Sequence, residues 1–76
     1  MEKITYETFK TSIVDRLEPL LGLTRQETEK YVDSEEEEVR SRFDTYKKEY
    51  EQGKITEKIF LGSCVDSVGL CLYMMY

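Results

Sequence analysis

Histidine is absent from this sequence of 76 residues. Carboxylate-bridged di-iron sites combine glutamates with a Glu-x-x-His motif, so the sequence cannot supply that set of ligands. The acidic run Asp33–Glu38 also lacks the central glycine that a calcium-binding loop requires. We therefore expect the protein to hold no metal ion and to use no cofactor.

Basic residues are few as well: 11 Lys and Arg stand against 16 Asp and Glu, which gives a net charge of −5. Neutralising nucleic-acid phosphates or anionic membranes requires clustered basic residues. We expect neither direct nucleic-acid binding nor membrane binding. Hydrophobic residues nevertheless make up 39% of the chain, which favours a folded protein over a disordered one. The length predicts a single domain over residues 1–76.

The two cysteines, Cys64 and Cys71, lie seven residues apart in a segment predicted to be helical. Seven helical residues rise roughly 10.5 Å, whereas a disulfide joins Cα atoms no more than about 7 Å apart. The nearest basic residue in sequence is Lys58, so we interpret both thiols as small hydrophobic groups rather than nucleophiles. Residues 1–10 also lack the apolar stretch of a signal peptide. A reducing, cytoplasmic location is therefore expected.

Capping residues and glycines divide the chain into predicted helices. The first helix should begin after Thr5, whose side chain can accept a hydrogen bond from a free amide. It should kink at Pro19 or end just before it, and Gly22 is a natural stop. The segment Thr24–Glu27 reads Thr-Arg-Gln-Glu, a capping box that predicts a short second helix to about Val32.

The segment Ser34–Glu37 reads as a second capping box and predicts a longer helix that ends near Gln52, before Gly53. Apolar residues along this stretch are spaced 7, 4, 3 and 4 apart, which is typical of a narrow, coiled-coil-like seam. The members of this seam are Val32, Val39, Phe43, Tyr46 and Tyr50.

A last helix is predicted from Thr56 onward, and Asp66 is the only charged residue between Ile59 and Tyr76. A helix that is apolar on nearly every side is expected to be surrounded by neighbours. The carboxylate of Asp66 then needs a partner, such as an Arg or Lys of another helix, and the alternative is a partly exposed position on a groove. Gly62 and Gly69 share the face of Asp66, and two glycines in one helix indicate close approach of another backbone.

These patterns predict an all-α fold: a small bundle of three main helices plus one short helix, with the apolar C-terminal helix at the centre. A membrane-spanning role for Ile59–Tyr76 is disfavoured, because Asp66 near its middle would cost about 2.5–3.5 kcal/mol. Tyr73 and Tyr76 lie in an apolar end that either packs on its own domain or contacts a partner.

The stretch Thr24–Glu38 contains seven acids and two bases, a local net charge of −5 that equals that of the whole chain. One interpretation is a partner-facing acidic surface that imitates nucleic-acid phosphates. The alternative is that acids at the start of a helix satisfy its dipole and its free amides. The candidate partner-binding residues are Glu27, Asp33, Glu35, Glu36 and Glu38, together with Tyr46, Tyr50, Tyr73 and Tyr76.

The segments Ile4–Lys10, Tyr50–Thr56 and Leu72–Tyr76 together resemble segments of short uncharacterised proteins encoded in gut Firmicute genomes and their mobile elements. This resemblance covers about half of the chain and includes no catalytic motif. It implies a bacterial, cytosolic and phage- or plasmid-associated origin. It implies no activity that could be assigned to particular residues.

The sequence therefore predicts a non-enzymatic protein that acts by binding another protein or itself. A specific version is an inhibitor from a mobile element that occupies a basic groove of its target. The competing hypothesis is a structural homodimer that buries the seam, or the apolar end of the chain, between two copies. An enzyme would need a pocket that brings Asp66 together with a tyrosine or lysine, and nothing in the sequence points to one.

Overall fold

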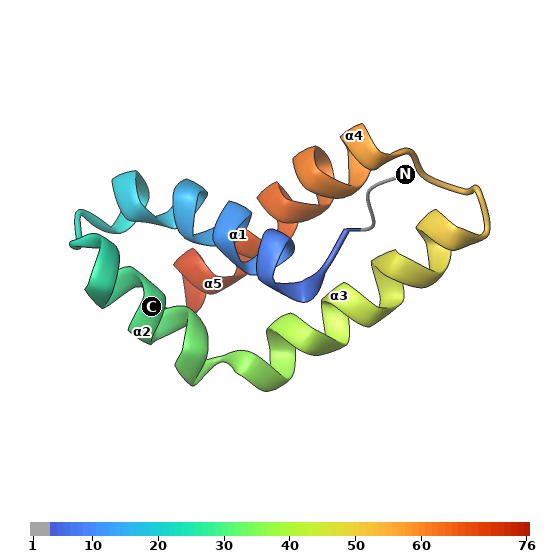
Figure 1. Ribbon diagram of the computed structural model, residues 1–76. Coiled ribbons are helices and arrows are strands. Elements are labelled where there is room, and N and C mark those ends of the chain that lie inside the picture. The colour runs from blue at the N-terminus through green and yellow to red at the C-terminus, as the bar shows by residue number, and fades with distance from the viewer. Residues whose placement is uncertain (1–3) are drawn as a thin grey trace.

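The computed structural model describes residues 4–76, which form only helices and their connections (Figure 1). The predicted all-α bundle is confirmed. Helix α4, the π-helical turn η1 and helix α5 follow one another without a break, so they act as one long helix. The elements are α1 (Tyr6–Leu21), α2 (Arg25–Ser34), α3 (Glu36–Glu51), α4 (Glu57–Ile59), η1 (Phe60–Cys64) and α5 (Val65–Met75).

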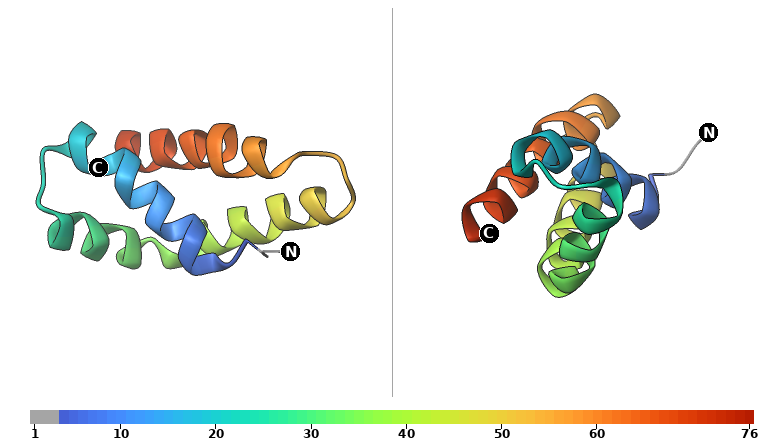
Figure 2. Two further views of the ribbon diagram at one scale, coloured as in Figure 1. Left: turned by 45° about the horizontal axis from the view of Figure 1, so that its top comes forward. Right: turned by 90° about the vertical axis from the view of Figure 1, so that its left-hand side faces the viewer.

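The helices lie in two layers with α1 between them. Helices α2 and α3 follow each other along one side, the last helix runs along the other, and α1 crosses diagonally between the two sides (Figure 2). Helix α1 packs chiefly against α5 and α2. The molecule measures 35 × 21 × 17 Å. The short helix of the predicted bundle is α2, and the apolar last helix is partly buried against α1.

The predicted helix starts are confirmed at three threonines. The hydroxyl of Thr5 accepts a hydrogen bond from an α1 amide, and that of Thr56 caps the last helix at 3.2 Å. Thr24 and Glu27 form the complete capping box: the Glu27 amide donates to the Thr24 hydroxyl at 3.2 Å, and the Thr24 amide donates to the Glu27 carboxylate at 3.0 Å. Each arrangement satisfies amides that have no partner inside the helix.

The predicted stops are also confirmed, because Gly22 and Gly53 both adopt positive φ angles of 67° and 75°. After α3, the amides of Gly53 and Lys54 donate to carbonyls of the last turn, which is the Schellman arrangement. Helix α1 continues through Pro19 as far as Leu21, so the expected alternative that it ends before Pro19 is wrong.

The capping box predicted at Ser34–Glu37 is wrong. Ser34 is the last residue of α2, and its hydroxyl donates to the Tyr31 carbonyl at 2.6 Å instead of accepting from an α3 amide. Only Glu35, with φ −106° and ψ 27°, separates the two helices, and α3 begins without a side-chain cap. A residue that is still helical cannot adopt the extended backbone of an N-cap, which explains the failure.

The hydrophobic core centres on Phe60, whose ring is fully buried. Its centroid lies 5.6 Å from that of Phe9 and 5.9 Å from that of Phe43. The rings of Tyr46 and Tyr50 complete the cluster at 6.5 and 5.6 Å. The predicted seam along α2 and α3 faces α1 and the last helix. Its apolar side chains therefore pack in or against the core of the same chain.

The expected close approach of a backbone at Gly62 and Gly69 is wrong. A Cβ atom built at Gly62 would meet nothing within 4 Å, and one at Gly69 would lie 3.6 Å from the Cβ of Arg16, an ordinary contact. Neither residue is required by its surroundings to lack a side chain.

We therefore predict that Gly62→Ala raises the free energy of unfolding by about 0.5–1 kcal/mol, because alanine loses less backbone entropy on folding. Chemical denaturation followed by circular dichroism measures this change. The matched control is Gly22→Ala, which should lower stability by about 1 kcal/mol since Gly22 has a positive φ. A loss of stability in Gly62→Ala would show that the π-helical turn requires glycine.

Candidate functional site

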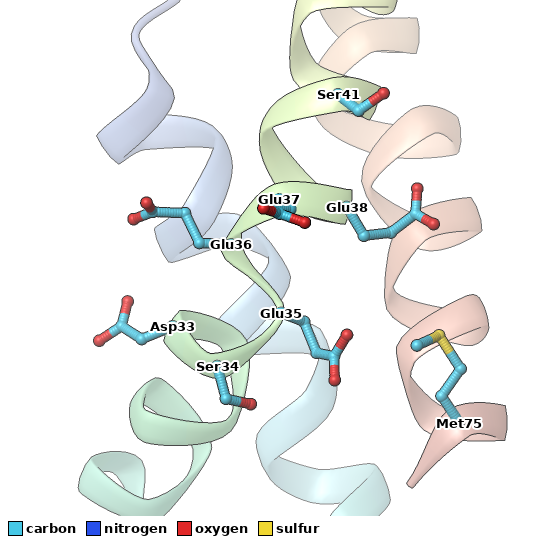
Figure 3. A pocket seen from close by; sticks show the side chains of 8 residues that line it. All are labelled: Asp33, Ser34, Glu35, Glu36, Glu37, Glu38, Ser41 and Met75. Atoms are coloured by element: carbon cyan, nitrogen blue, oxygen red, sulfur yellow. The ribbon is translucent and has the colours of Figure 1, made fainter.

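The acidic residues around the junction of α2 and α3 line an open hollow of about 640 Å³ (Figure 3). We call this site the acidic hollow. Residues of α2, of the junction and of the first turns of α3 form most of its lining, and one side chain of α5 reaches its edge. The lining residues are Asp33, Ser34, Glu35, Glu36, Glu37, Glu38, Ser41 and Met75.

The carboxylates of the acidic hollow spread outward rather than converge on one point. Glu35 and Glu38 point toward α5 and the side chain of Met75, whereas Asp33 and Glu36 point to the opposite side (Figure 3). This spread follows from the sequence, because consecutive residues of a helix are separated by about 100° around its axis. The arrangement suits several basic groups on a surface better than one bound cation.

Three acids of the acidic hollow form ion pairs within the chain. The pairs are Lys10–Asp33, Arg40–Glu36 at 3.6 Å and Arg42–Glu38 at 3.1 Å. The hydrogen bond that Lys10 donates to Asp33 raises the pKa of Lys10, and the one that Arg42 donates to Glu38 raises the pKa of Arg42. Within residues 4–76, Glu35 and Glu37 have no ion-pair partner, so they carry the uncompensated charge of the hollow.

Glu27 lies outside the acidic hollow. Its carboxylate accepts the hydrogen bond from the Thr24 amide, and this bond holds the pKa of Glu27 below its usual value. Together with Glu29 and Lys30, Glu27 lines a second shallow hollow that Asp33 joins to the first. The charge of Glu27 is therefore used in capping α2, whereas Glu35 and Glu37 make no such hydrogen bond to the start of α3.

The four candidate tyrosines fall into two groups. Tyr46 and Tyr50 pack against the core beside Phe60, so they contribute mainly to the fold. Tyr73 and Tyr76 are 45% and 64% exposed and remain accessible to a partner.

Tyr31 is a contact residue that the sequence did not indicate. Its hydroxyl donates to the carbonyl of Leu72 at 2.6 Å, and its ring meets that of Tyr76 edge to face, with centroids 5.0 Å apart. Burial raises the pKa of this hydroxyl. The bond joins α2 to α5 across 41 residues of sequence, and it holds the end of α5 beside the acidic hollow.

The prediction that Asp66 pairs with a base of another helix is confirmed, because its carboxylate contacts the guanidinium of Arg16 in α1. The side chain of Asp66 is 60% exposed and lines a shallow hollow, so the last helix is not buried all round at this position. Neither cysteine forms a disulfide, as predicted, and burial raises the pKa of the Cys64 thiol, which weakens it as a nucleophile. Residues 4–76 contain no cluster of acids and cysteines arranged to hold a metal ion.

The helix Glu57–Met75 is long and apolar enough to cross a membrane, with a mean hydropathy of 1.4. Only 33% of this segment is buried inside the molecule. A core helix of a soluble protein meets the same criteria of length and composition, so these two properties do not assign the helix to a membrane.

No protein-family model, curated protein or solved structure matches this chain.

Proposed function

We propose that the protein is a non-enzymatic module that binds a partner protein with a basic surface, and that the acidic hollow is the binding site. The observation that carries this proposal is the uncompensated charge of Glu35 and Glu37 in an open hollow of about 640 Å³. Other acids of the hollow are held in place by their own arginine or lysine, which keeps the surface ordered.

A basic partner would contact the hollow through Lys or Arg side chains. Arginine is favoured, because its guanidinium binds a carboxylate through two parallel hydrogen bonds. Met75 at the edge of the hollow and Tyr76 beyond it supply adaptable apolar contact area. The negative surface would also steer a basic partner during association, and salt would weaken this effect.

A specific version of this proposal is an inhibitor encoded by a mobile element. Such an inhibitor would occupy the basic, nucleic-acid-binding groove of its target and exclude the nucleic acid. The support is the set of successive carboxylates at one helical junction, of which Glu35 and Glu38 point to the same side and would face a basic groove placed there.

We expect the double variant Glu35→Gln/Glu37→Gln to bind its partner at least about tenfold more weakly, a loss of ~1.4 kcal/mol. The measurement is affinity capture from host lysate with mass spectrometry, followed by titration of the captured protein. Stability should fall by no more than about 1 kcal/mol, because neither side chain has an ion-pair partner in residues 4–76 and the charge of Glu37 interacts only with the dipole of α3.

The matched control is Asp44→Asn/Glu51→Gln, which removes the same charge from exposed positions on the same helix outside the hollow. This control should bind like the parent protein. Equal weakening in both variants would reduce the effect to overall charge, and unchanged binding in the Glu35/Glu37 variant would disprove the site. Competition by a DNA duplex for the captured protein tests the inhibitor version separately.

A further inference from the structure

The outer side of α1 and α5 carries an apolar surface that no other part of residues 4–76 covers. A shallow hollow of about 430 Å³ lies there, lined by Asp15, Arg16, Pro19, Leu20, Asp66, Gly69 and Leu70. Leu20 is 53% exposed and Leu70 is 54% exposed. This surface lies outside the acidic hollow, with which it shares no lining residue.

The apolar surface continues along α5 beyond the hollow. Asp66, Leu70, Tyr73 and Met74 follow one another at intervals of 4, 3 and 1 residues, which places them on one helical face. Among residues 4–76, Met74 is the most exposed large apolar side chain, at 78%. We call Pro19, Leu20, Leu70, Tyr73 and Met74 the outer patch. An exposed apolar patch with a polar rim is typical of a protein interaction site.

The charges around the outer patch favour a second copy of the chain over a strongly basic partner. The rim carries both signs, with Arg16 paired to Asp66 and Arg25 paired to Asp15 and Glu18. Its three acids and two bases sum to −1, compared with −5 for the whole chain. A strongly basic partner has little to attract it here. A second copy of the chain, itself at −5, would meet less repulsion on this nearly neutral face than on the acidic hollow.

We propose that the outer patch is the interface of a symmetric homodimer, in which Arg16 of each copy lies opposite Asp66 of the other. A twofold interface must be complementary to itself, and a rim that carries both signs meets this condition. The side chains of Arg16 and Asp66 are 42% and 60% exposed, so each keeps free hydrogen-bonding groups for a second partner. Leu20 and Leu70 would form the buried centre of the interface.

This proposal is independent of the acidic hollow and gives the homodimer hypothesis a surface other than the Val39–Tyr50 seam. The side chains of that seam pack in or against the core of their own chain. The outer patch consists of five residues, so we expect a dimer at the weak end of specific interfaces, with a dissociation constant on the order of micromolar. A chain this short buries a small fraction of its surface on folding, so burying further surface in a dimer would increase its stability.

Sedimentation equilibrium at several protein concentrations tests the proposal. The parent chain should form dimers, and Leu70→Glu should raise the dissociation constant at least tenfold while its circular dichroism spectrum stays unchanged. The matched control is Thr45→Glu, which adds the same charge at an exposed position on α3 and should dimerise like the parent chain. A parent chain that remains monomeric throughout, or a Leu70→Glu variant that dimerises as well as Thr45→Glu, would overturn the proposal.

Charge exchange tests the twofold arrangement itself. In a homodimer of Arg16→Glu, the new glutamate of each copy would face Asp66 of the other, and the two acids would repel. In a homodimer of Asp66→Arg, the new arginine would face Arg16, and the two bases would repel. Each variant alone should therefore be monomeric. An equimolar mixture restores opposite charges at both contacts and should form a heterodimer. Failure of the mixture to associate would overturn the proposed contact.

A membrane is the competing occupant. Flotation with phosphatidylcholine vesicles distinguishes a membrane from a second copy. Lipid would be the occupant if the parent chain were monomeric in solution and bound vesicles only with Leu20 and Leu70 intact. We expect no vesicle binding by the dimer.

Discussion

Replacing Phe60 by alanine should lower the free energy of unfolding by about 3–5 kcal/mol, which is most of the stability of a domain this small. The Phe60 ring is fully buried, and four aromatic rings from α1 and α3 surround it. Alanine leaves a cavity at this position. The neighbouring rings belong to two different helices, α1 and α3, so they cannot all move inward to fill it. Urea denaturation followed by circular dichroism measures the loss.

Two further variants keep this prediction testable if Phe60→Ala does not fold. Phe60→Leu retains most of the volume, so it should fold and lose less stability than the alanine variant. Ile59→Ala changes the neighbouring residue, which is 42% exposed, and should alter stability by no more than about 0.5 kcal/mol. A stability loss below about 1 kcal/mol in Phe60→Ala would contradict the placement of this ring at the centre of the core.

The local features of the fold could be predicted because their causes are local. A threonine before a helix, a glycine after it and a Thr-x-x-Glu box each satisfy backbone groups within a few residues. The structure confirms these signals at Thr5, Thr24, Thr56, Gly22 and Gly53. Ser34 carried the same signal, but α2 continues through it, so the local pattern did not determine the helix boundary there.

For contacts between distant segments, the sequence could predict the type of partner but not the residue that provides it. The sequence required a base for Asp66 but did not identify Arg16, and it gave no reason to expect the bond between Tyr31 and Leu72. The long apolar run suggested a helix with neighbours on nearly every side. Within residues 4–76, α1, α2 and α3 cover one face of the last helix and leave Leu70 and Met74 exposed.

The acidic site was predictable in composition and not in geometry. The run of acids indicated the junction of α2 and α3, but the side chains fan out around it and three of them are paired with bases. Glu37, left out of the predicted site, is one of the two acids without such a partner. Ion pairs at spacing i, i+4 can be anticipated from sequence, whereas the pair between Lys10 and Asp33 depends on the fold.

Leu72→Ala should be the second most destabilising of the changes considered, with a loss of about 2–5 kcal/mol. Leu72 is fully buried in the core that α5 shares with α1, although its neighbours Tyr73 and Met74 are exposed. Its carbonyl also receives the hydrogen bond from Tyr31, so the same residue ties α5 to two helices. Loosening it should free the end of α5 and move Met75 away from the acidic hollow.

Met74→Ala is the matched control, because Met74 is 78% exposed two residues further along the same helix. In dilute solution, where the chain is monomeric, this change should alter stability by no more than about 0.5 kcal/mol. Thermal and urea unfolding of the two variants therefore compare the loss of a buried side chain that packs α5 against the core with the loss of an exposed apolar side chain on the same helix. Equal effects of the two substitutions would mean that Leu72 does not anchor α5, and the placement of Met75 at the acidic hollow would then lose its support.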